Sequence, residues 1–143
     1  MTDLSALREK ILRVVEPAPN DDGAYIQAAD LLREISLHSL PPLRLAILRS
    51  FTIEPLLEAL QVKAFLSGFR LELFLNEFNQ VAQEILSENS ELYRFGPQMI
   101  FLAVRLEEIG SEAVETISGW LDRIERQSTA KVLVSNLDRK SVV

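Results

Sequence analysis

The sequence predicts an α/β fold with a parallel sheet of about four strands in the order 2-1-3-4, preceded by a two-helix lead. Apolar runs, each with at most one charged residue, occupy residues 43–48, 71–75, 99–104 and 130–134. Runs without alternation are typical of parallel strands that are buried on both faces. Amphipathic stretches separate the runs, and polar residues follow each of them. The succession of apolar runs and amphipathic stretches favours a sheet with helices packed on it.

The helical lead precedes the first apolar run. Residues 5–15 place apolar side chains at helical spacing and end before Pro17. A second helix is expected over residues 24–37, with His38 at its end, where partial positive charge suits the carbonyl dipole. Pro41 and its neighbour Pro42 forbid helix and favour extended backbone.

The two prolines therefore predict a division of the chain into a lead (1–40) and an α/β domain (41–143). After the first strand, Pro55 suits the first turn of a helix that Thr52 is predicted to cap. Gly68 is expected to end that helix.

The remaining elements follow the same pattern. A stripe at i, i+3, i+4, i+7 and i+8 begins at Phe78 and predicts an amphipathic helix after the second strand. Gly96-Pro97 breaks the chain before the third strand, and Ser111 is predicted to open a last long helix.

Composition excludes several classes of protein. The chain has 143 residues, no cysteine, one histidine and a formal net charge of −6. Disulfides and cysteine or multi-histidine metal sites are excluded. The acidic balance argues against nucleic acid as a partner. No stretch suits a membrane span or signal peptide, so a cytoplasmic location is expected.

The loops after the strands define the candidate site, because carboxyl ends of parallel strands meet at one edge. With the order 2-1-3-4, strands one and three flank the switch point and bring Ser50, Thr52 and Arg105 to one crevice. Other polar loop residues are Arg49, Asn76, Glu77, Asn79, Gln80, Glu107, Ser135, Asn136 and Asp138. The residues predicted to bind at this edge are Ser50, Thr52, Asn79, Gln80, Arg105 and Asn136.

Ser50 admits two interpretations. A serine at a strand-to-helix turn lies near backbone amides that could hold an oxyanion, which makes it a weak candidate nucleophile. Activation requires a base within hydrogen-bond reach, and His38 lies twelve residues upstream. The structural alternative is that Ser50 or Thr52 caps the following helix. No glycine-rich phosphate loop or paired-aspartate strand end is present, so neither a cofactor nor a metal is expected in this chain.

Three segments carry a family resemblance: LRLAILRSFTIEPL, LELFLNEFNQVAQEIL and SELYRFGPQMIFLAVRLEEI. Over residues 43–137 they resemble the amino-terminal domain of FkbH-like proteins, the haloacid dehalogenase subfamily IIIC group. The resemblance implies a three-layer fold similar to flavodoxin and to SGNH (GDSL-type) hydrolases. It also implies a following phosphatase-like domain that binds magnesium and moves a glyceryl unit from a phosphorylated glycolytic intermediate onto an acyl carrier protein in polyketide biosynthesis.

The sequence departs from true SGNH enzymes at their catalytic blocks. Arg49-Ser50-Phe51 replaces their Gly-Asp-Ser, no Asn matches the third block beside Arg105, and the terminal Asp-x-x-His block is absent. Relative to a complete family member, the α/β domain is expected to be truncated.

Three functions follow as hypotheses. The first is a noncatalytic recognition domain that engages an acyl carrier protein or docks a phosphatase-like domain. Because carrier proteins are acidic, it would need a basic patch. Arginines available for such a patch are Arg44, Arg49, Arg70, Arg94 and Arg105. The second is a small SGNH-like esterase or acyltransferase that uses Ser50. The third is a homo-oligomer formed through the open edge of the sheet.

Overall fold

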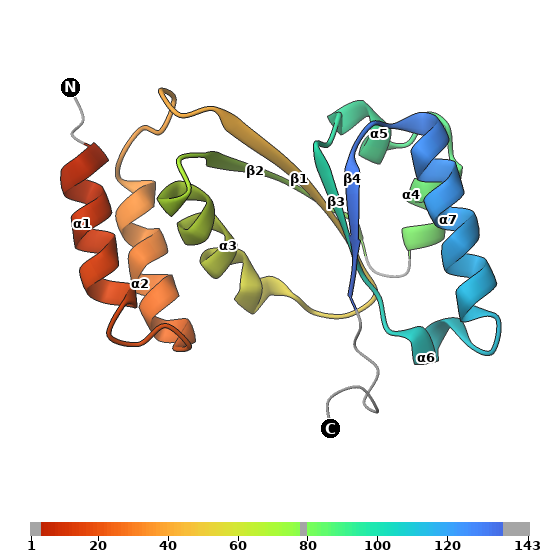
Figure 1. Ribbon diagram of the computed structural model, residues 1–143, viewed down its shortest axis with the longest axis horizontal. Coiled ribbons are helices and arrows are strands. Elements are labelled where there is room, and N and C mark those ends of the chain that lie inside the picture. Colours follow the sequence, from red (N-terminus) through yellow and green to blue (C-terminus); the bar gives the residue numbers. More distant parts are fainter. Residues whose placement is uncertain (1–3, 78–79, 136–143) are drawn as a thin grey trace. The chain divides into compact units, whose positions relative to one another are not determined.

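The computed structural model describes residues 4–77 and 80–135 and confirms the predicted fold class (Figure 1). The strands are β1 (Pro42–Arg49), β2 (Arg70–Leu75), β3 (Met99–Ala103) and β4 (Lys131–Val134). They form one sheet in the order β2-β1-β3-β4, as predicted. β3 runs parallel to β1, with Leu45 opposite Met99, and parallel to β4, with Met99 opposite Lys131.

Seven helices are described: α1 (Leu4–Val15), α2 (Asp22–Arg33), α3 (Glu54–Leu66), α4 (Val81–Leu86), α5 (Glu91–Phe95), α6 (Leu106–Ile109) and α7 (Ala113–Gln127). The described residues group into two compact units. The first unit contains residues up to Leu43 together with Ile53–Glu72, and the second contains Arg44–Thr52 and the residues from Leu73 onward. The predicted domain boundary between 1–40 and 41–143 stays a prediction.

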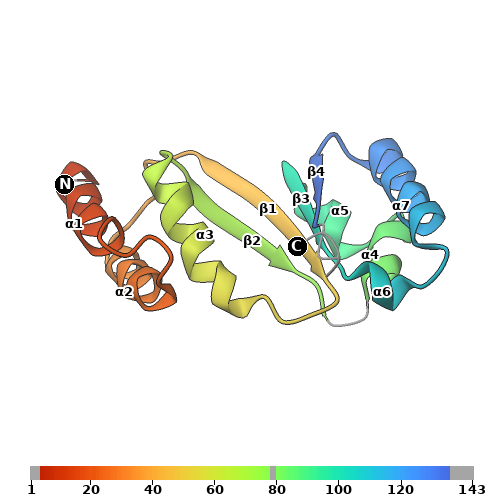
Figure 2. The same ribbon diagram turned by 60° about the horizontal axis from the view of Figure 1, so that its bottom comes forward.

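The first unit is built around three helices, and both views show α1, α2 and α3 next to one another (Figures 1 and 2). α1 and α2 each turn an apolar stripe inward, as the helical spacing of their residues predicts, and α3 contributes Val62 and Phe65. The shared core consists of Leu7, Ile11, Val15, Tyr25, Ala28, Ala29, Leu32, Val62 and Phe65. The helical lead therefore packs against α3 and is part of a common core.

The core of the second unit lies between one face of β1 and β3 and the helices α4, α5 and α7. Its members are Ala46, Leu48, Val81, Ile85, Leu92, Ile100, Leu102, Val104, Trp120 and Ile124. Alternate residues of β1 contribute to it, because successive side chains of a strand point to opposite faces. No helix in the described part of the chain is long and apolar enough to cross a bilayer.

Several predicted boundaries are wrong. α2 ends at Arg33 rather than at residue 37, and His38 lies in an exposed turn instead of at the helix end. The turn is closed by the Leu40 amide, which donates to the Leu37 carbonyl at 3.0 Å. The chain leaves the helix early because it must become extended before Pro41.

The predicted cap of α3 is also wrong. The N-cap position is held by Ile53, without a side-chain capping bond, and Thr52 is exposed. The Ile53 amide instead donates to the Glu54 carboxylate at 3.0 Å, which places negative charge at the positive end of the helix. Pro55 does lie in the first turn, as predicted.

α7 begins at Ala113 rather than at Ser111. Gly110 has a φ of +97°, and its carbonyl accepts the Ala113 amide at 3.2 Å, so a turn occupies the predicted first residues of the helix. The short helices α5 and α6 were not predicted. Phe78, at the predicted start of α4, lies outside the described residues.

Candidate functional site

Asn76, directly after β2, holds the carboxyl end of β1. Its side-chain oxygen accepts the Arg49 amide at 2.8 Å, and its side-chain nitrogen donates to the Glu77 carbonyl at 2.8 Å and to the Arg49 carbonyl at 3.5 Å. Both residues are buried: Asn76 is 3% exposed and Arg49 is 8% exposed. The Asn76 amide thereby replaces the ladder bonds that the two strands lose where they end.

Ser50 makes the corresponding link from β1 to β3. Its amide donates to the Ala103 carbonyl at 3.0 Å, and its hydroxyl oxygen accepts the Arg105 amide at 3.3 Å. Ser50, one of the side chains predicted to face a crevice between these strand ends, therefore bridges them. Ser50 does not cap α3, so the structural role differs from the one predicted.

Ser135 forms a third link, from β4 to β3. Its hydroxyl accepts the Val104 amide at 3.2 Å and donates to the Val104 carbonyl at 3.1 Å, while its own amide donates to the Leu102 carbonyl at 2.9 Å. Three strands thus end in a polar side chain that binds the backbone of the neighbouring strand. We call Asn76, Ser50 and Ser135 the strand-end clasps.

The positively charged side chain of Arg105 lies beside Ser50, the clasp between β1 and β3. The guanidinium of Arg105 is 5.0 Å from the centre of the Phe51 ring, close enough for a cation–π contact. Arg105 is exposed, Phe51 is half-buried, and Thr52 next to it is exposed. We call Phe51, Thr52 and Arg105 the Arg105 surface. It presents a positive charge on an aromatic base at the carboxyl edge of the sheet.

The part of the carboxyl edge that follows β2 is negatively charged. A pocket of about 250 Å³ there is lined by Phe74, Leu75, Asn76, Glu77, Gln80, Glu84 and Glu91. One of its three carboxylates already has a partner, because Glu84 accepts the Leu92 amide at the start of α5 at 3.0 Å. The edge of the sheet is therefore acidic at β2 and carries Arg105 at β3.

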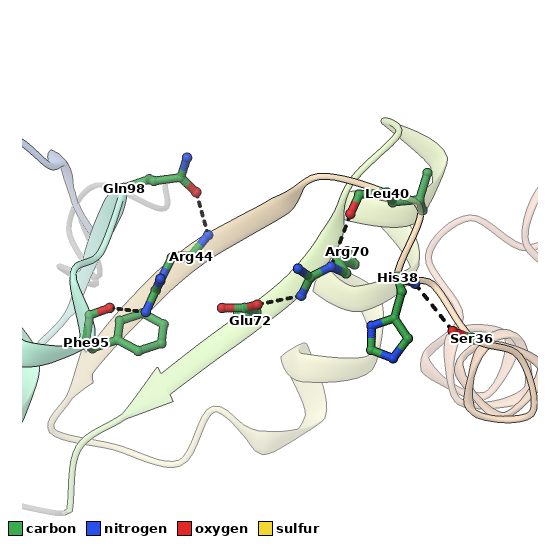
Figure 3. A network of polar contacts seen from close by, with 8 residues as sticks. All are labelled: Ser36, His38, Leu40, Arg44, Arg70, Glu72, Phe95 and Gln98. Carbon is green, nitrogen blue, oxygen red and sulfur yellow. Dashed lines mark hydrogen bonds and ion pairs between the residues drawn. The ribbon is translucent and has the colours of Figure 1, made fainter.

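His38 belongs to the first unit, whereas Ser50 belongs to the second. Figure 3 shows the His38 amide bound to the Ser36 hydroxyl, at 3.5 Å, and the nearby Arg70 guanidinium bound to the Leu40 carbonyl and to Glu72. In the second unit, Arg44 donates to the Phe95 carbonyl and lies 5.0 Å from the Phe95 ring. The Arg49 guanidinium donates to the Asn76 carbonyl at 3.4 Å, so Arg44, Arg49 and Arg70 each bind a carbonyl of their own unit.

The predicted site residues fall into two groups. Ser50 and Arg105 are joined directly, with Thr52 two residues beyond Ser50, and Gln80 lines the acidic pocket. Asn79 and Asn136 lie outside the described residues. Asn76, Phe51 and Ser135 were not among the predicted binding residues, although the loop pattern placed Asn76 and Ser135 at this edge. Within the described ranges, no group of three or more His, Asp or Glu side chains is placed to hold a metal ion.

The chain is an α/β domain whose fold is similar to that of a solved structure. No protein-family model matches the sequence, and no curated protein matches it. The structure matches a crystal structure of the N-terminal part of the protein BF1531 from Bacteroides fragilis, which contains a phosphatase domain complexed with Mg. The TM-score is 0.60 and the sequence identity 18%, and the match covers 98% of this chain and 35% of that one. The chain thus spans about a third of the length of the matched chain, which is itself the N-terminal part of a protein, and the likeness is one of fold.

Proposed function

We propose that this chain is a noncatalytic recognition and docking domain of an FkbH-like protein, in which a phosphatase-like domain loads a glyceryl unit onto an acyl carrier protein. The observation that carries the proposal is the use of Ser50. Its hydroxyl oxygen accepts the Arg105 amide and ties two strand ends together. A nucleophile would instead need a general base at hydrogen-bond distance.

The fold likeness supports the family part of the proposal. The matched structure is the N-terminal part of a protein and contains a phosphatase domain. The motifs that resemble FkbH-like proteins include the residues that end β1 and those that end and follow β3, where the clasps bind. A domain of this kind would position its partners for chemistry performed elsewhere.

The charges at the carboxyl edge support an acidic partner at one end of it. A carrier protein is acidic, and this chain has a net charge of −6, so binding requires local attraction that outweighs the overall repulsion. The exposed Arg105 guanidinium offers that attraction. Glu77, Glu84 and Glu91 would repel the same partner from the β2 end, which would fix its orientation.

Calorimetric titration with a purified acyl carrier protein tests this proposal. Arg105→Glu should weaken binding by about tenfold or more, which is about 1.4 kcal/mol. Arg126→Glu, in the last turn of α7, makes the same change in net charge at an exposed position away from the edge and should change the affinity less than about threefold. Phe51→Ala should also weaken binding, because the guanidinium loses its aromatic base.

Equal losses in Arg105→Glu and Arg126→Glu would show that net charge alone matters and would contradict a site at this edge. The same titrations with a phosphatase-like domain of an FkbH-like protein separate the two partners. If only that domain binds, and Arg105→Glu weakens it, the docking partner is the phosphatase-like domain. If neither partner binds the wild-type chain, the proposal is wrong.

A further inference from the structure

The outer edge of β4 is a second surface of the second unit, independent of the carboxyl edge. β4 is the last strand in the sheet, so within the described residues it pairs with β3 alone. The Lys131 amide donates to the Gln98 carbonyl at 3.0 Å, and the Ser135 amide donates to the Leu102 carbonyl at 2.9 Å. Backbone groups alternate in direction along a strand. The N–H and C=O groups of Val132 and Val134 therefore point away from β3.

The side chains along this edge are apolar. Leu133 is 49% exposed and Val134 is 39% exposed. Val132 is partly buried against the core of the second unit. A hollow of about 450 Å³ beside the strand is lined by α7, by the loop that follows it and by one residue of β4: Leu121, Ile124, Glu125, Ser128, Thr129, Ala130 and Val132. Edge strands are commonly protected by charges or proline, and here the single charge, Lys131, is at the first residue of the strand.

We propose that this edge binds a second copy of the chain, with the two β4 strands antiparallel about a two-fold axis at Leu133. In this register Val132 lies opposite Val134 of the partner subunit, and Val134 lies opposite the partner subunit's Val132. Each pair exchanges two hydrogen bonds between backbone groups that point away from β3. The N–H and C=O groups of Val132 and Val134 in one copy thus match those of Val134 and Val132 in the other, as a symmetric interface requires.

The side chains fit the same register. Leu133 faces the partner's Leu133 in a pair without backbone hydrogen bonds, where cross-strand side chains come closest. Two exposed leucines would then cover each other. Lys131 falls opposite the partner's Ser135, so no like charges meet within the paired strands.

Sedimentation equilibrium of the full chain, from roughly 1 μM to 1 mM, tests the proposal over the affinity range of small interfaces. The average mass should rise with concentration from 16.2 kDa towards twice that value. Leu133→Lys should hold the mass at the monomer value throughout, because it places two ammonium groups opposite each other. Val134→Pro should do the same, since it removes a donor that points away from β3 and leaves the β3–β4 ladder intact.

Ile26→Lys is the matched control, because Ile26 in α2 is exposed to the same degree, 48%, and belongs to the other unit. It should dimerise like the wild type. Far-UV circular dichroism confirms that each variant is folded. A wild-type mass that stays at the monomer value at every concentration would overturn the proposal. So would a dimer that survives both Leu133→Lys and Val134→Pro, or one that Ile26→Lys abolishes.

Discussion

Asn76 shows how single polar side chains shape the carboxyl edge of the sheet. It is almost fully buried, and its amide binds the backbone of Arg49 on the neighbouring strand and of Glu77 beside it. An asparagine fits because one side-chain amide both accepts and donates. The loop pattern placed this residue at the edge, but its role could not be predicted. The choice of partner depends on where β1 and β2 end relative to each other, which composition and spacing do not fix.

Asn76→Ala should destabilise the fold by about 2–3 kcal/mol, because the Arg49 amide would be left buried without an acceptor. Urea denaturation followed by circular dichroism measures the change. Gln80→Ala, at an exposed residue of the same loop, should change the free energy of unfolding by less than about 0.5 kcal/mol. Similar small effects of both substitutions would contradict a structural role for Asn76.

Ser50→Ala separates the clasp from a nucleophile. Loss of the acceptor for the Arg105 amide, at a half-buried position, should cost about 0.5–1.5 kcal/mol of stability. Any ester hydrolysis by the purified chain should be unchanged in this variant. Steady hydrolysis of p-nitrophenyl acetate that Ser50→Ala abolishes, and Ser135→Ala retains, would instead favour the esterase hypothesis.

Tyr93 provides a pH-dependent test of packing in the second unit. Burial raises the pKa of its phenol above 10.0; the Arg123 guanidinium opposes this and the Glu84 carboxylate adds to it. Its hydroxyl donates to the Ile85 carbonyl. The folded state therefore favours the neutral phenol, and its contribution to stability is present below pH 10 and is lost as the pH rises through the folded-state pKa. The alkaline decline in the free energy of unfolding should be shallower in Tyr93→Phe. Identical declines would contradict this assignment.

At the scale of the elements, the ends of helices show what local sequence can and cannot predict. Gly68 was predicted to stop α3, and it lies two residues past the end of the helix with a φ of +91°. Glycine adopts this backbone region without strain, so the signal is local. The ends of α2 and α7 were misplaced because the turns at Leu37–Leu40 and Gly110–Ala113 depend on how the chain enters β1 and leaves β3.

Two glycine substitutions should have opposite effects on stability. Gly68→Ala meets no atom within 4 Å but is strained at positive φ, and it should destabilise by about 1 kcal/mol. Gly119→Ala, inside α7 and equally uncrowded, should stabilise by about 0.5–1 kcal/mol through helix propensity. Thermal unfolding of both variants checks the pair, and a shift of the same sign in both would contradict the backbone explanation.

At the scale of the whole molecule, the order of strands was predictable and the grouping of the helices was not. Mostly apolar runs indicated parallel strands, and the predicted order 2-1-3-4, which places the switch point between strands one and three, is the order β2-β1-β3-β4 of the structure. The prolines predicted a two-helix lead laid on, or hung beside, the α/β domain; in the structure Ile11 and Leu32 of the lead share a core with Val62 of α3. Packing between helices that are distant in the sequence cannot be predicted from the local spacing of apolar residues.

We propose that the Arg105 surface recognises a partner and that the strand-end clasps hold this surface in place. Titration of the ¹⁵N-labelled chain with an acyl carrier protein, followed by amide chemical shifts, tests it most directly. The largest changes should fall on Phe51, Thr52 and Arg105, and Arg105→Glu should remove them. Changes confined to α1 and α2, or changes that persist unaltered in Arg105→Glu, would contradict the account.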